Sequence, residues 1–166
     1  MEEEELMDEL YRFDNLAKAM NDIGILVQER YKESLQKGDR IATGALINSV
    51  KYIYSNRDLM FEISLNLEDY WKYVEYGTRP HFPPVSKILE WVKAKPVLPR
   101  PSNGKLPTEE QLAFLIARKI SEVGTEGGHH LSDTMDDLNE EISRMVEEAL
   151  EKDLDRIGTA VIRTLI

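Results

Sequence analysis

The stretch that most constrains the fold runs from Tyr70 to Pro84 and reads YWKYVEYGTRPHFPP. Its apolar and small residues recur three and four positions apart, which predicts a short helix with one packed side. Gly77 follows at the point where a chain leaving a helix needs a positive φ. Pro83 and Pro84 then stiffen the exit from the corner. Such a corner either carries catalytic residues or fixes how two parts of a subunit, or two neighbouring subunits, meet.

Composition limits the classes of function. The 166 residues carry 21 basic and 31 acidic side chains, and the net charge of -10 argues against specific binding of free nucleic acid. An acidic surface along which DNA slides without sticking is compatible with this charge. Because the chain has no cysteine, disulfides and thiolate metal sites are excluded. No apolar run approaches the ~20 residues of a membrane span, so we expect a soluble protein made in the cytoplasm, with no membrane partner.

Periodicity predicts two long helices. An apolar residue recurs every three or four positions from about Leu6 to Leu35, which indicates one N-terminal helix. A second stripe follows Ser132, a candidate helix cap, and predicts a long C-terminal helix that Gly158 ends or loosens. The N-terminal stripe packs either within its own domain or in part against another subunit.

A hairpin is predicted between the long helices. Residues 59–67 alternate apolar and polar side chains, the pattern of a half-buried strand. Residues 50–55 are its natural antiparallel partner. Residues 45–49 form either a short helical piece or the start of the first strand.

Further helices are expected after the corner. Residues 85–95 place their apolar side chains on one helical face, and the prolines of residues 96–107 predict an irregular arm. Thr108 with Gln111 matches the capping box of another helix, which Gly124 ends.

These elements define an α+β fold, in which a small antiparallel β-sheet packs against helices and long helices lie at the N-terminal and C-terminal ends. We interpret the chain as a single domain, 1–166. Its parts are an N-terminal helix (1–38), a β-hairpin and helix core (40–95), a proline-rich arm (96–107) and C-terminal helices (108–166).

The titratable residues do not form a recognisable metal-binding or catalytic pattern. His81, His129 and His130 invite a metal site, but their spacing lacks the paired ligands of helical or hairpin sites, so we predict no metal and no other cofactor. Glu75 is either a general base or a structural anchor. Because no second carboxylate or nucleophile stands at a suitable spacing, we predict no catalytic residue and interpret Glu75 as fixing the corner through Arg79 or Arg40.

Two motifs together resemble a known family. Thr43-Gly44-Ala45-Leu46 with Ser49 matches T-G-x-L-x-x-S, and Tyr70 to Thr78 matches Y-x-x-Y-V-E-x-G-T. The continuation Arg79 to Pro84, then Leu89-x-Trp91-Val92, is also similar. Over residues 40–150 the chain resembles the tailed-phage head-tail joining proteins, variously called neck, tail-completion or minor tail components.

The resemblance implies a non-enzymatic structural subunit of an oligomeric ring at the neck, as tail terminator or in tail completion. It implies further copies, portal or connector proteins and tail proteins as partners, and double-stranded DNA that passes through the lumen without specific binding. The implied location is the virion, after assembly in the host cytoplasm. The residues expected to hold the fold or an interface are Thr43, Gly44, Leu46, Ser49, Tyr73, Glu75, Gly77, Thr78, Arg79, Pro83, Pro84 and Trp91.

Two other hypotheses fit the residues. The long stripes also suit a helical adaptor that binds one protein partner without forming a ring. A metal-dependent hydrolase would use His81, His129 and His130.

Overall fold

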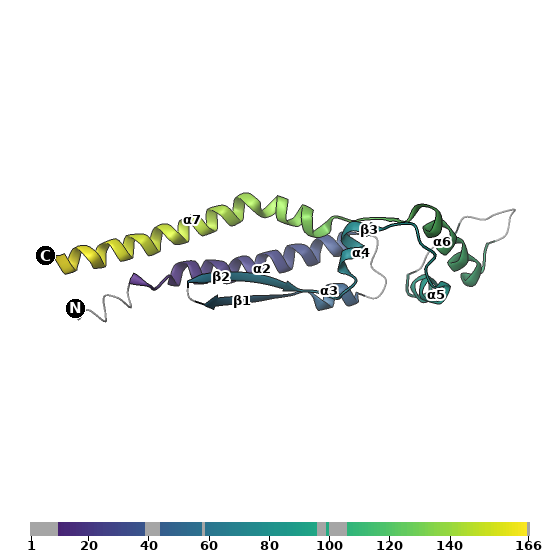
Figure 1. Cartoon of the computed structure of the whole chain (residues 1–166), viewed down its shortest axis with the longest axis horizontal. Helices are drawn as coiled ribbons and strands as arrows, with labels where there is room; N and C mark the ends of the chain where they lie inside the picture. Colours follow the sequence, from purple (N-terminus) through teal and green to yellow (C-terminus); the bar gives the residue numbers. More distant parts are fainter. Residues whose placement is uncertain (1–9, 39–43, 58, 96–98, 100–105, 166) are drawn as a thin grey trace. The chain divides into compact units, whose positions relative to one another are not determined.

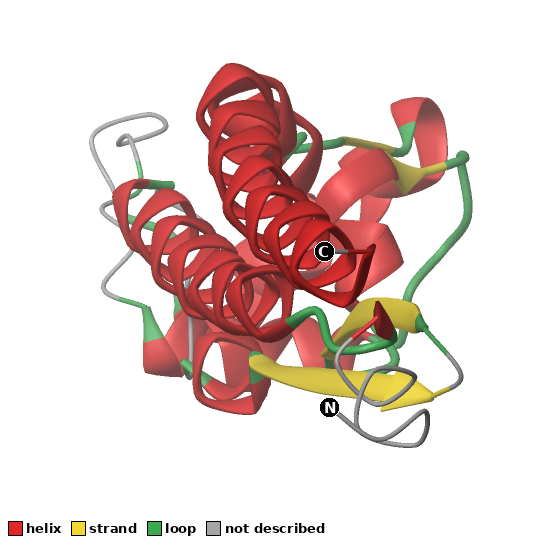
Figure 2. Cartoon of the chain, turned by 90° about the vertical axis from the view of Figure 1, so that its left-hand side faces the viewer, coloured by secondary structure: helices red, strands yellow, loops and turns green. Residues whose placement is uncertain are grey.

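The computed structural model of the protein describes residues 10–38, 44–57, 59–95, 99 and 106–165, with side chains up to Arg163. The fold is α+β, as predicted from the sequence, with two long helices and a small antiparallel hairpin (Figures 1 and 2). The elements in chain order are α2 (Asp14–Lys37), α3 (Ala45–Ser49), β1 (Lys51–Arg57), β2 (Met60–Asn66), α4 (Trp71–Tyr76), β3 (Gly77–Thr78), α5 (Val85–Ala94), α6 (Glu109–Val123), β4 (Thr125–Glu126) and α7 (His130–Leu165).

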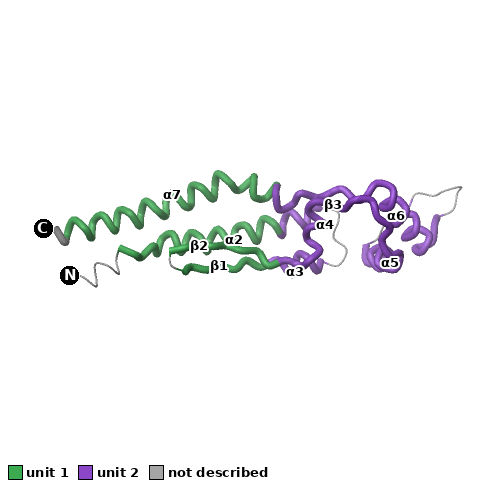
Figure 3. Tube along the Cα trace, in the orientation of Figure 1, with its two compact units in different colours: residues 1–31, 51–66, 133–166 green, residues 32–50, 67–132 purple. Residues whose placement is uncertain are grey.

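The chain divides into two compact units, each made of segments that are distant in the sequence (Figure 3). Unit 1 comprises residues 1–31, 51–66 and 133–166, and unit 2 comprises residues 32–50 and 67–132.

The core of unit 1 lies between α2, α7 and the β-hairpin, which lie side by side in Figures 1 and 2. Its buried centre consists of Ile23 and Val27 from α2 and Leu138 from α7. Ile63 and Leu65 of β2 pack against this centre. The helical period of the long elements and the two-residue period of the strand thus meet in one apolar core.

The predicted hairpin is confirmed. Strands β1 and β2 pair antiparallel, with Lys51 opposite Asn66 and Tyr54 opposite Ile63. The alternation of β2 appears in its burial, because Met60 and Glu62 are exposed. Residue 50 is not part of the strand: Val50 caps the end of α3 and is fully buried.

The N-terminal helix begins later than predicted. Helix α2 starts at Asp14, and residues 11–13 are not helical; residues 1–9 lie outside the described part. Asp153 of α7 fixes this start, since its carboxylate accepts hydrogen bonds from the N–H groups of Asn15 (3.2 Å) and Leu16 (2.9 Å). A cap supplied by another element leaves no mark in the local pattern of the helix.

Helix α7 corrects two expectations about its ends. Ser132 is not its cap, because the helix begins at His130 and Ser132 lies in the first turn. Gly158 does not end it, because the helix continues to Leu165. One glycine in a helix interior costs about 1 kcal/mol, which tertiary packing of a long helix easily exceeds.

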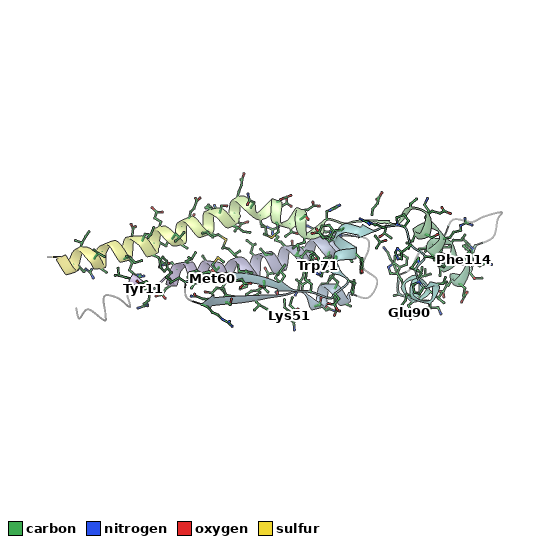
Figure 4. The ribbon with its side chains drawn as sticks, viewed as in Figure 1. Tyr11, Lys51, Met60, Trp71, Glu90 and Phe114 are labelled. Atoms are coloured by element: carbon green, nitrogen blue, oxygen red, sulfur yellow. The ribbon has the colours of Figure 1, made fainter. Side chains whose placement is uncertain are left out.

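Unit 2 contains a pair of packed helices, α5 and α6. Helix α6 starts with the predicted capping box: Thr108 accepts from the N–H of Gln111, and the Gln111 side chain accepts from the N–H of Thr108. Figure 4 labels Glu90 and Phe114 on these two helices, and both side chains are exposed. The short segment at residues 45–49 is helical, which decides between the two predicted alternatives.

Candidate functional site

The corner after α4 has the predicted geometry. Helix α4 stops at Gly77, which has a φ of 73° and donates its N–H to the carbonyl of Tyr73. Residues that carry a Cβ rarely adopt this φ, which explains why a glycine follows the helix.

Glu75, near the end of α4, binds the beginning of α7. One oxygen, Oε2, accepts the N–H of Leu131 (2.9 Å). The other, Oε1, accepts the N–H (2.9 Å) and the hydroxyl (2.7 Å) of Ser132. The side chain of Glu75 is only 1% exposed. A buried carboxylate therefore satisfies N–H groups that the first turn of any helix leaves without an intrahelical partner, and its charge complements the helix dipole.

The environment of Glu75 favours its ionised form. Burial acts to raise the pKa of this carboxyl, but the hydrogen bonds from Leu131 and Ser132 outweigh it, with a further contribution from nearby His129. The net result is a pKa below the ordinary value of a glutamate.

Backbone hydrogen bonds hold the same two segments together. Gly128 donates to the carbonyl of Val74 (2.8 Å), and His129 donates to the carbonyl of Glu75 (3.1 Å). A Cβ on Gly127 would lie 2.2 Å from the Glu75 carbonyl oxygen, so only glycine allows this approach. The glycine-rich stretch 124–128 thus lets α4 and the start of α7 meet backbone to backbone.

A short β-pair, β3 with β4, joins the ends of α4 and α6. Both helices end in Glu-x-Gly-Thr, with Gly77 and Gly124 each at a φ of 73°. Thr78 pairs with Thr125, and their hydroxyl oxygens are 3.0 Å apart. A Cβ on either glycine would lie 2.0 Å from the carbonyl oxygen of the opposite threonine. We call this pair of β3 and β4 the crossing. Each of its strands therefore contains the threonine of a Gly-Thr sequence, and each follows a helix that ends at a glycine with a positive φ.

The first motif forms α3. Gly44 precedes the helix with a φ of 70°, and Leu46 is buried. The hydroxyl of Ser49 donates to the carbonyl of Leu46 (2.7 Å) and accepts the N–H of Glu68 (3.0 Å). Ser49 therefore ties α3 to the segment that leads into α4, while Thr43 lies outside the described residues.

An apolar groove of about 810 Å³ lies within unit 2. It brings together residues from both sequence motifs and from α5, and the predicted site residues among its lining are Gly44, Leu46, Tyr73, Pro84 and Trp91. Burial raises the pKa of the Tyr70 phenol on its wall, against a hydrogen bond to the backbone of Leu46, and the nearby Glu68 also raises it. Tyr73 is 63% exposed, so its ring is available to a partner.

The other predicted residues that the structure describes do not line this groove. Arg79 is exposed and forms no ion pair with Glu75, whose described partners are the N–H and hydroxyl groups of α7, so the alternative that paired Glu75 with Arg79 is wrong. Arg40 lies outside the described residues. Pro83 is buried.

The histidines occupy separate environments. His81 contacts the carbonyl of Arg79 through Nδ1 (2.9 Å), whereas Nδ1 of His130 contacts the hydroxyl of Ser34 (3.1 Å). Within the described part of the chain, no three histidine or acidic side chains gather in a way that could hold a metal ion.

Sequence reasoning missed the partners of Glu75. Two of the three hydrogen bonds come from the backbone N–H groups of Leu131 and Ser132, which carry no residue-specific signal; only the Ser132 hydroxyl is specific to its residue. A signal did exist for Gly124 and Thr125, since Glu122 to Thr125 repeats the Glu-x-Gly-Thr of the corner.

Comparison with family models, with curated proteins and with solved structures found no match to this chain. The described helices include none that is long and apolar enough to span a membrane.

Proposed function

We propose that the protein is a structural subunit of an oligomeric ring in a tailed-phage virion, at the neck or tail-completion level between portal and tail. The groove of unit 2 is the observation that carries this proposal. Gly44 and Leu46 of the first motif line it together with Tyr73 of the second and Trp91 of α5. Motif residues gathered around an open apolar surface suit a subunit that binds other proteins.

The chemistry of Glu75 supports a structural role for the corner. Three hydrogen bonds from Leu131 and Ser132 occupy both of its oxygens, and the side chain is buried. A general base needs an oxygen within reach of the proton that it abstracts. The carboxylate of Glu75, in the second sequence motif, instead joins α4 to the first turn of α7.

The charge of the chain suits a passage for double-stranded DNA. The net charge is -10, and α7 alone carries ten acidic against four basic residues. Negative surface charge repels phosphates, so DNA would move past such subunits without specific binding.

Assembly with portal and tail proteins tests the proposal. The purified protein is mixed with each of these proteins, and native mass spectrometry and negative-stain images are recorded. We expect closed rings, and we expect the protein in purified virions at the neck or tail end. A protein that stays monomeric in every mixture and is missing from virions would contradict the proposal.

A further inference from the structure

We draw no further inference here: the strongest candidate, the apolar groove of about 810 Å³ in unit 2 that residues of α3, α4 and α5 line, carries none because nothing in the described part of the chain shows what covers it.

Discussion

Two buried carboxylates, Glu75 in unit 2 and Asp153 in unit 1, perform the same task in different surroundings. Each accepts three hydrogen bonds, two of them from backbone N–H groups in the first turn of a long helix. Glu75 is 1% exposed and Asp153 is 0% exposed. Both therefore replace a local cap by a carboxylate from a distant part of the chain.

The surroundings of the two carboxylates differ in how much room they leave for a substitution. Around Glu75, the Gly77 and Gly127 backbones approach other backbone atoms so closely that no Cβ fits. Around Asp153, the start of α2 has a second support, since the Arg156 side chain donates to the carbonyl of Arg12. The same capping carboxylate is therefore surrounded by close backbone contacts in unit 2, whereas in unit 1 a side-chain contact supports the helix start as well.

The largest effect is expected for Gly77→Ala. Its Cβ would lie 2.0 Å from the Thr125 carbonyl oxygen at a φ of 73°, so we expect a loss of about 3–5 kcal/mol in the free energy of unfolding. The control is Gly44→Ala, because Gly44 has a φ of 70° but, among the residues that the structure describes, its Cβ would meet only the Asn48 side chain, at 3.8 Å. This control should lose about 1–2 kcal/mol. Urea denaturation followed by circular dichroism measures both, and equal losses would show that the crossing is not rigid.

Glu75→Ala should follow, with a loss of about 2–4 kcal/mol, because the partly buried donors of Leu131 and Ser132 would lose their acceptor. Glu75→Gln keeps the shape and one acceptor oxygen, so its loss should be smaller. The midpoint of urea unfolding, at unchanged slope, measures both changes. An alanine variant as stable as the wild type would contradict the assigned role of this carboxylate.

Asp153→Ala should lose about 1–3 kcal/mol, less than Glu75→Ala, because the Arg156 contact to Arg12 still holds the start of α2. Hydrogen exchange of the Asn15 and Leu16 amides reports on the affected turn directly. Asp153→Asn, which retains one acceptor oxygen, is the matched control. If Asp153→Ala costs more than Glu75→Ala, the proposed contrast between the two surroundings is reversed.

In both units, the sequence predicts the features that depend on residues close together in the chain. Helical and strand periods gave the long helices and the hairpin, and the position of Gly77 at a helix end gave its positive φ. The partners of the two carboxylates were not predictable, because Glu75 and Leu131 are 56 residues apart and the N–H groups involved are common to every residue. Asp153 lies among many acidic residues of α7, so nothing in the pattern distinguishes the buried one.

Stability should depend on pH through Glu75. Since the pKa of Glu75 is lower in the folded protein than in the unfolded chain, its contribution to stability is fully present above the unfolded value of about 4.3. The contribution is lost as the pH falls through the folded pKa. We expect the wild type to lose more stability than Glu75→Gln when urea unfolding is repeated at decreasing pH in this range. Parallel curves for the two proteins would refute this linkage.

The smallest effect, and one of opposite sign, is expected for Gly158→Ala in unit 1. Gly158 lies inside α7 and a Cβ there would meet no atom of the described residues within 4 Å, so alanine should stabilise the helix by about 0.5–1 kcal/mol. Thermal unfolding compares this variant with the wild type. The same substitution thus raises stability in unit 1 and lowers it at Gly77, because the glycine at the crossing is required by the approach of two backbones and the glycine in α7 is not. A destabilised Gly158→Ala protein would contradict this contrast between the two glycines.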